Sequence, residues 1–381
     1  MTRRRFIHLC LSLALLAGVA GTLAAPARAD VRIGITPAVF EVNAKPGDTG
    51  ETEITVYNKG TDAFSILAAA EPYPGAPEEY SAAAFLSVEP ATFDLAPGQE
   101  QKVTLRIAVP DEVESGGRYA YVTFLTRNPG DASGGSSISV ESKVAATVLM
   151  TVHGKGKLST KADVEQFVPV LEADGRIGFG VLLANKGNFH FKPSGNVEIK
   201  TAEGDSYGKL EFVDSGLALP GTEQFLYTQG TIPLEPGKQY ESSMTLDYGQ
   251  KKPIKKKVSF VATANVAIDD PTICENLDRG PTVTVPIQND GDLAVVPVLQ
   301  VTINDASGNR VSGVELPAGT ISRPHDELKA ASDLADRLVS GDYTLVAQFQ
   351  YGTAAPMTKQ VPFSIGGSGP NVAPLCQPAS S

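Results

Sequence analysis

The chain has 381 residues, with 43 acidic against 32 basic side chains and a formal net charge of −11. This excess of negative charge disfavours a nucleic-acid partner, because binding to phosphates depends on lysine and arginine. After residue 30 no apolar run reaches the roughly 20 residues of a transmembrane helix. Helical periodicity is nearly absent there, and alternating runs recur about every 8 to 12 residues between Gly, Pro and Asn, which predicts an all-β chain.

The N-terminus has the three parts of a secretory signal peptide. These are the basic Arg3–Arg5, the apolar Leu9–Val19 and the cleavage site Ala27–Ala29. Thr2–His8 also resembles the twin-arginine export motif, so that route is one way out of the cytoplasm. We expect cleavage after Ala29, a periplasmic or extracellular location, and a mature chain with 28 basic and 43 acidic residues, a net charge of −15.

The stretch 138–152 alternates between apolar and polar residues. Its apolar members, which period-two alternation places on one face of a strand, include Ile138, Val140, Val144, Ala146 and Val148. Fifteen residues in one register would make a strand of about 50 Å, well beyond the usual length. Such a strand could bind a partner strand, or a second copy of the chain, along its edge. Two shorter strands meeting at residues 142–143, or one long strand covered by its own domain, are the alternatives.

An internal repeat organises the rest of the chain. Asn185–Pro193 aligns with Asn289–Pro297 at an offset of 104 residues, and Tyr240–Phe260 aligns with Tyr343–Phe363 at an offset of 103. The first domain shares less, although Asn58 begins the same Asn-x-Gly pattern. We interpret this pattern, which tolerates a positive φ angle, as a turn from one strand into the next.

These features predict three tandem immunoglobulin-like β-sandwiches between the signal peptide and a flexible tail. The predicted segments are 1–29, 30–155, 156–262, 263–366 and 367–381. One segment departs from the β pattern, because Leu328, Ala331, Leu334 and Leu338 have helical spacing and predict a short helix within 326–338. Cys274 and Cys376 survive cleavage and predict one disulfide in an oxidising compartment, two independent thiols being the alternative.

Four segments of the first domain resemble the first domain of PapD-type periplasmic pilus chaperones: Thr36–Phe40, Glu53–Asn58, Phe85–Pro90 and Ala96–Ile107. Surface proteins of the WxL-interacting type look similar. The resemblance covers about a third of the chain. It implies that the glycine-rich loop 128–137 is the mobile loop of such chaperones and that residues 138–152 are their donor strand.

One departure from that family concerns docking. PapD-type chaperones carry an arginine in the first strand that grips the terminal carboxylate of a pilus subunit, and Pro37 stands at the matching position here. Proline cannot form an ion pair. Arg32 and Lys143 are the candidate ionic anchors that could substitute for the arginine.

A second candidate surface is a lysine cluster between the last two strands of the second domain. Its members are Lys251, Lys252, Lys255, Lys256 and Lys257. The aligned segment of the third domain, 353–359, has one lysine, so the fold does not demand the cluster. A solvated hairpin is the plain interpretation, and a site for an anionic envelope polymer or lipid headgroup is the functional one.

No motif predicts catalysis, a metal or a cofactor. His153, His190 and His325 lie in different predicted domains without ligand spacing, and the sequence has no nucleophile elbow, zinc motif or phosphate loop. We therefore expect a non-enzymatic, chaperone-like protein that binds other proteins by β-strand addition and assembles or displays surface structures. The alternative is an adhesion or scaffold protein of the cell envelope that binds wall polymer or lipid headgroups.

Overall fold

The computed structural model describes residues 32–127, 141–276, 280–315, 322–335, 337–366 and 371–376. Within these ranges the regular structure is β, apart from the short 3-10 turns Glu78–Tyr80 and Ala83–Phe85, so the predicted all-β class is confirmed. None of the helices in the described part is long and apolar enough to cross a membrane. The predicted signal peptide, the loop 128–137, Ile138 and Val140 lie outside the described residues.

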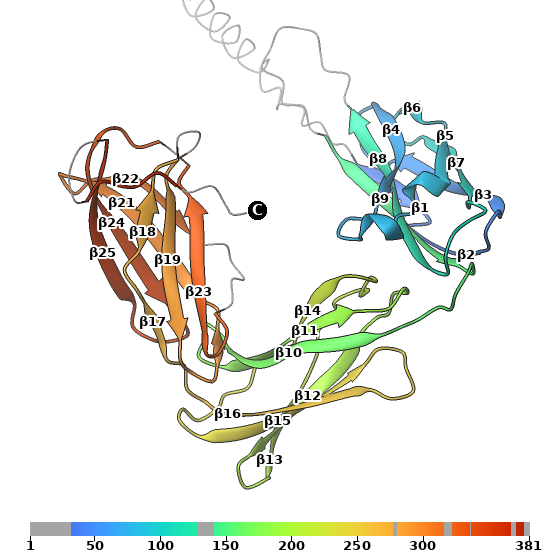
Figure 1. Cartoon of the computed structure of the whole chain (residues 1–381). Helices are drawn as coiled ribbons and strands as arrows, with labels where there is room; N and C mark the ends of the chain where they lie inside the picture. Colours follow the sequence, from blue (N-terminus) through green and yellow to red (C-terminus); the bar gives the residue numbers. More distant parts are fainter. Residues whose placement is uncertain are drawn as a thin grey trace, which may run out of the picture. The chain divides into compact units, whose positions relative to one another are not determined.

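The chain divides into two compact units, Met1–Lys157 and Leu158–Ser381. Buried hydrophobic side chains of the described residues form one core cluster in the first unit and two in the second. This arrangement is that of several packed β-sandwiches (Figure 1). The three-domain division at 30–155, 156–262 and 263–366 stays a prediction.

The first unit has two sheets around one core. One sheet has the order β1-β3-β7-β5, with bounds Ile33–Thr36, Thr49–Asn58, Glu100–Ala108 and Leu86–Glu89. The other has the order β2-β9-β8-β4-β6, with bounds Val39–Ala44, Lys143–Val152, Gly116–Arg127, Phe64–Pro72 and Thr92–Leu95. Alternate residues of the strands enter the core, as the period of two predicts.

The second unit has four sheets. Two of them contain β10 (Ala162–Leu171), β11 (Ile177–Asn185), β12 (Ser194–Thr201), β13 (Ser206–Glu211), β14 (Glu223–Tyr227), β15 (Gln239–Asp247) and β16 (Ile254–Val261), in the orders β14-β11-β10-β20 and β13-β12-β15-β16. The other two contain β17 (Val266–Ile268), β18 (Thr272–Cys274), β19 (Thr282–Asn289), β21 (Val298–Asp305), β22 (Arg310–Glu315), β23 (Asp326–Asp333), β24 (Gly341–Gln350) and β25 (Met357–Ile365). The short β20 (Ala294–Val295) pairs with β10.

The strands of the sequence repeat correspond in pairing as well as in order. The sheet β13-β12-β15-β16 has its counterpart in β22-β21-β24-β25. The pairing of β12 with β13 shifts register after Ile199, and the pairing of β21 with β22 shifts after Ile303, 104 positions later. An irregularity at equivalent positions indicates that the two segments share local geometry as well as strand order.

The predicted helix in 326–338 is wrong, because residues 326–333 form strand β23. All eight of its residues pair with β19. Ala330 and Leu334 are buried in the core cluster formed within residues 266–373, and Leu328 packs against it. The leucine spacing suits a helix, but hydrogen bonds to a neighbouring strand and burial in a core outweigh local propensity.

The repeated Asn-x-Gly pattern is a buried corner, and Gly187 and Gly291 do not use the positive φ angle that the pattern tolerates. Asn289 ends β19 and has 0% exposure. Its amide nitrogen donates to the carbonyl oxygens of Leu293 (2.9 Å) and Ser322 (3.2 Å), and its side-chain oxygen accepts from the N–H of Gly291 (3.1 Å). A side chain at Gly187 would meet the carbonyl oxygen of Ser159 at 2.2 Å, so close backbone approach explains that glycine.

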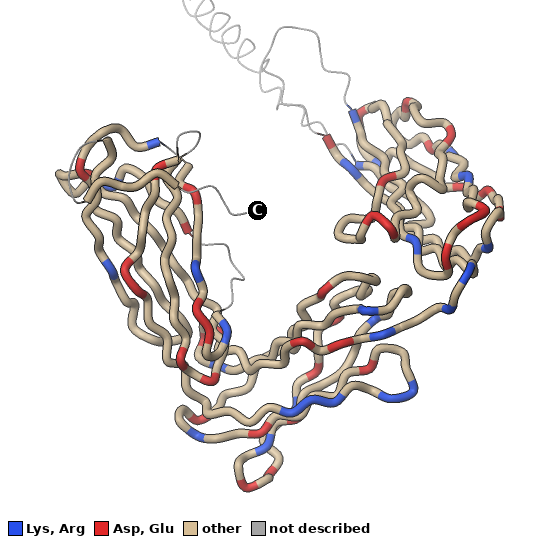
Figure 2. The backbone as a smooth tube through the Cα atoms, viewed as in Figure 1, with Lys and Arg blue, Asp and Glu red and all other residues tan. Residues whose placement is uncertain are grey.

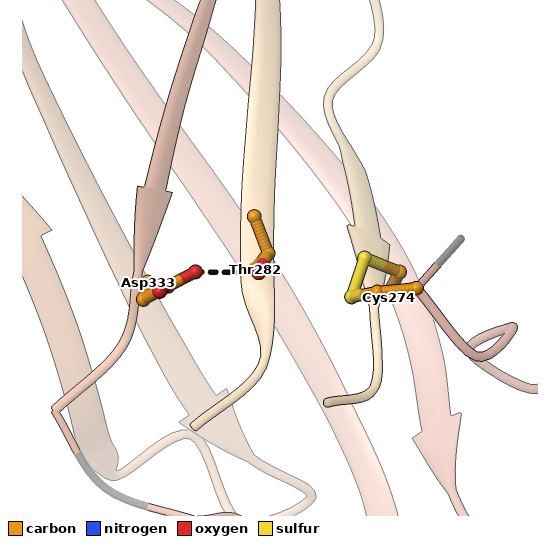
Figure 3. The surroundings of a disulfide bond; sticks show 4 residues. Cys274, Thr282 and Asp333 are labelled. Atoms are coloured by element: carbon orange, nitrogen blue, oxygen red, sulfur yellow. Dashed lines mark hydrogen bonds between the residues drawn. A yellow bond between two sulfur atoms is a disulfide. The ribbon is translucent and has the colours of Figure 1, made fainter. Parts of the chain in front are cut away.

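The predicted disulfide between Cys274 and Cys376 is confirmed, with a Cα–Cα distance of 4.9 Å. Figure 3 shows it at the end of β18, beside the hydrogen bond that joins Thr282 of β19 to Asp333 of β23. The backbone N–H of Glu275 donates to Pro374, and the N–H of Cys376 donates back to Glu275. The disulfide therefore fixes a terminal segment that already pairs with the chain after β18.

Candidate functional site

The candidate site lies where β9 loses one of its two neighbours. Lys143–Val152 pairs antiparallel with β8 along its whole length. On the other side, β2 pairs in parallel with residues 147–152, beginning with Val39 opposite Thr147. Among the described strands, none pairs with residues 143–146 on that side. We call the side of Lys143–Ala146 that faces away from β8 the open edge.

Hydrogen bonds fix which backbone groups face the open edge. The N–H of Thr147 donates to Ala38 at 2.8 Å, on the β2 side, whereas the N–H of Thr126 in β8 donates to Ser142 at 2.8 Å on the opposite side. Because backbone groups alternate along a strand, the N–H and C=O groups of Lys143 and Ala145 face the open edge. They are the groups that a further strand would use.

The open edge exists because the chain changes sheets just before β2. Thr36 is the last residue of β1 and pairs with Thr55 of β3, in the first sheet. Val39, three residues later, pairs with β9 in the second sheet. Pro37 lies in this crossing between the two sheets, and its side chain has no charge with which to bind a carboxylate. Val39 is 53% exposed beside the end of the open edge.

The apolar face of β9 belongs to the core of its own unit. Ala146 and Val148 have 0% exposure, and Val144 packs partly buried against the same core. Ala146 and Val148 therefore hold the strand in place, and their burial does not fit the predicted direct contact with a partner. The strand itself begins at Lys143, since residues 141–142 are not in a strand, so a single unbroken strand over 138–152 is wrong.

The two candidate ionic anchors differ in their surroundings. The ammonium group of Lys143 contacts the Glu71 carboxylate of β4 at 2.6 Å. Glu71 also accepts a hydrogen bond from the Thr123 hydroxyl at 3.0 Å. The hydrogen bond from Lys143, assisted by that from Thr123, lowers the pKa of Glu71 below its ordinary value. Lys143 therefore already has an anionic partner inside the unit.

Arg32 lies one residue before β1, and its carbonyl oxygen accepts the N–H of Lys59 at 2.7 Å. It precedes the strand that pairs in the first sheet, whereas Lys143 belongs to the second. No sequence pattern predicted the pairing of Lys143 with Glu71, which is 72 positions away and meets it across β8. In the described part of the chain, no group of three His, Cys, Asp or Glu side chains could hold a metal ion.

No family model and no curated protein matches the chain. The solved structures similar to it are mostly PapD-like fimbrial chaperones, which confirms the predicted resemblance. The Class 5 fimbriae chaperone CfaA is 13% identical with a TM-score of 0.32, over 59% of this chain and 98% of that chain. The E. coli chaperone DraB is 14% identical with a TM-score of 0.30, over 59% and 96%.

A chain of the Salmonella enterica SafA pilin in complex with the SafB chaperone is 13% identical, with a TM-score of 0.31, over 60% of this chain and 96% of that chain. Identities and scores as low as these concern the fold and carry no argument about function.

Proposed function

We propose that this chain is a non-enzymatic, chaperone-like protein that binds a protein partner by strand addition at the open edge and so assembles or displays surface structures. The observation that carries the proposal is that β2 begins only at Val39, which leaves residues 143–146 of β9 paired on one side among the described strands. The export predicted from residues 1–29 belongs to the same proposal, since it would bring the protein to the periplasm or cell surface.

Strand addition suits the groups that the open edge presents. A partner strand gains affinity from main-chain hydrogen bonds to Lys143 and Ala145, and it gains register from alternate side chains. Placed there, it would lie end to end with β2, next to the exposed side chain of Val39. The partner's apolar residues then have a contact at one end of the edge. Fimbrial chaperones and their complexes with pilins, named among the similar structures, agree with this proposal without carrying it.

The burial of β9 supplies the rigidity that a docking strand needs. Residues 146, 148, 150 and 152 of β9 are fully buried, and the strand is paired on both sides over 147–152. The open edge is therefore a fixed extension of a well-packed strand. Binding of a partner would therefore cost this chain little conformational entropy. The same edge makes a homodimer of the isolated protein an expected competitor.

Ala145→Pro tests the proposal, because proline removes the N–H that faces the open edge and leaves the bonds to β8 in place. Ala145→Val is the matched control, since it adds bulk and keeps the N–H. The full chain would be co-expressed with each exported protein encoded beside its gene, and co-purification and sedimentation would report capture and dimerisation. We expect Ala145→Pro to lose capture or dimerisation at least tenfold, given the loss of main-chain bonding, and Ala145→Val to keep it.

Equal capture by wild type and Ala145→Pro would overturn strand addition at this edge. Thermal unfolding of the variant keeps the test interpretable. If Ala145→Pro loses its fold as well as its partner, the same test is made with Lys143→Pro, because the N–H of Lys143 also faces the open edge. Retention of the partner by a folded Lys143→Pro variant would likewise count against the proposal.

A further inference from the structure

The lysine hairpin is the strongest charged feature of the second unit. We use this name for Lys251, Lys252, Lys255, Lys256 and Lys257, in the turn between β15 and β16 and at the start of β16, and all five are exposed. Figure 2 shows the run of basic residues along this strand. Lys257 contacts Glu241 at 2.8 Å. For the other four lysines, the described residues provide no carboxylate within ion-pair distance.

Lysines elsewhere on the chain are commonly neutralised. Lys102, Lys186, Lys209 and Lys238 each contact a carboxylate at 2.7–2.9 Å. The chain also carries a net charge of −11, so carboxylates are plentiful. Four unpaired lysines within six residues therefore form a local positive field on an acidic protein.

The aligned hairpin between β24 and β25 shows that the fold does not require these lysines. At the offset of 103, Ala354, Ala355 and Thr358 stand where the lysine hairpin has Lys251, Lys252 and Lys255. The equivalent of Lys256 is Lys359, and it contacts Asp270 at 3.1 Å. The same scaffold thus exists in the same protein with its charge removed or paired.

The lysines surround the strand instead of lining one face. Lys256 stands opposite Met244, a buried residue, and so occupies the core-facing parity of β16, yet it is exposed. Lys255 and Lys257 take the opposite parity. β16 pairs with β15 alone among the described strands. A lysine at the inward parity of an edge strand opposes the addition of another strand, so the ligand of this hairpin is not a β-strand.

We propose that the lysine hairpin docks the protein onto an anionic phospholipid surface, with the turn and the start of β16 in contact with the headgroups. Charges that protrude around a hairpin match a planar array of headgroups, which needs no groove. Tyr248, at the start of the turn, makes an edge-to-face contact with Phe191, with 5.7 Å between the ring centroids. Its ring therefore packs within the unit instead of offering a stacking surface for sugars. A soluble anionic polymer is the competing ligand.

The magnitude follows from the four unpaired lysines. Each lysine near an anionic membrane strengthens binding about fivefold, which is about 1 kcal/mol per charge. Four of them give roughly several-hundred-fold tighter partition onto anionic than onto neutral vesicles. The attraction falls off within a Debye length, so it weakens steeply as salt is added. The acidic remainder of the chain is repelled by the same surface, which favours contact through the hairpin.

The test is co-sedimentation of the full chain with phosphatidylcholine vesicles that contain or lack phosphatidylglycerol, at low salt. The hairpin variant combines K251Q, K252Q, K255Q and K256Q. The control variant loses the same formal charge from paired lysines and combines K102Q, K186Q, K209Q and K238Q. We expect the hairpin variant to lose most of the binding, the control to keep it, and a four-arginine hairpin variant to keep it as well.

Three results would overturn the proposal. One is equal binding by wild type and hairpin variant, and another is an equal loss in the control. The third is wild-type binding to soluble polyphosphate in the absence of any binding to anionic vesicles, which would assign the hairpin to a polymer. All substituted lysines are exposed, so thermal unfolding should match that of the wild type.

Discussion

Asn289→Ala should be among the most destabilising single substitutions of a polar residue in this chain. The substitution removes two donated hydrogen bonds and one accepted bond at a site with 0% exposure. Three bonds at about 1 kcal/mol each, together with the cost of leaving the Gly291 N–H without its acceptor, amount to about 3–5 kcal/mol of unfolding free energy. The assay is urea unfolding followed by circular dichroism, with the midpoint and slope of the second unit compared between variants.

The chain contains its own replicates of this experiment. Asn58 and Asn185 make the same three kinds of hydrogen bond at exposures of 2% and 1%. Each alanine variant should therefore lose a similar free energy, with Asn58→Ala acting on the first unit and Asn185→Ala on the second. Asn43 is exposed on β2, and Asn43→Ala should stay within about 0.5 kcal/mol of wild type. A loss under about 1 kcal/mol for Asn289→Ala would refute the reasoning.

Two further predictions concern covalent and ionic links. Replacing Cys274 and Cys376 by serine opens a link with a sequence separation of 102. The loss of this loop closure should lower the free energy of unfolding by up to about 4–5 kcal/mol, measured as a lower urea midpoint of the second unit. An unchanged midpoint when reductant is added to the wild type would contradict this prediction. The hydrogen bond from Lys143 lowers the pKa of Glu71 from its ordinary value of 4.5. The pair therefore stabilises the fold at pH values above 4.5, and this stabilisation is lost as the pH falls through the lowered pKa of the folded state. Glu71→Gln should remove this part of the acid dependence, and an unchanged profile of stability against pH would count against the pair.

The sequence by itself determined the features that depend on local period and on comparison of the chain with itself. Alternation with a period of two predicted strands, because successive side chains of a strand point to opposite faces whatever the strand pairs with. The repeat predicted equivalent strands, and the register shifts after Ile199 and Ile303 occur at equivalent positions. The two cysteines that follow the predicted signal peptide left one pairing as the simplest outcome, and Cys274 joins Cys376.

Tertiary structure alone decided the features that depend on which strand lies beside which. The leucine spacing of 326–338 fits a helix and a buried strand, and pairing with β19 selected the strand. Lys143 meets Glu71 only because β4 and β9 flank β8. The open edge likewise results from where β2 begins, at Val39, a boundary that the composition of β9 does not encode. Hydrogen bonds between distant segments set these outcomes, and a local pattern contains no information on its neighbour across the sheet.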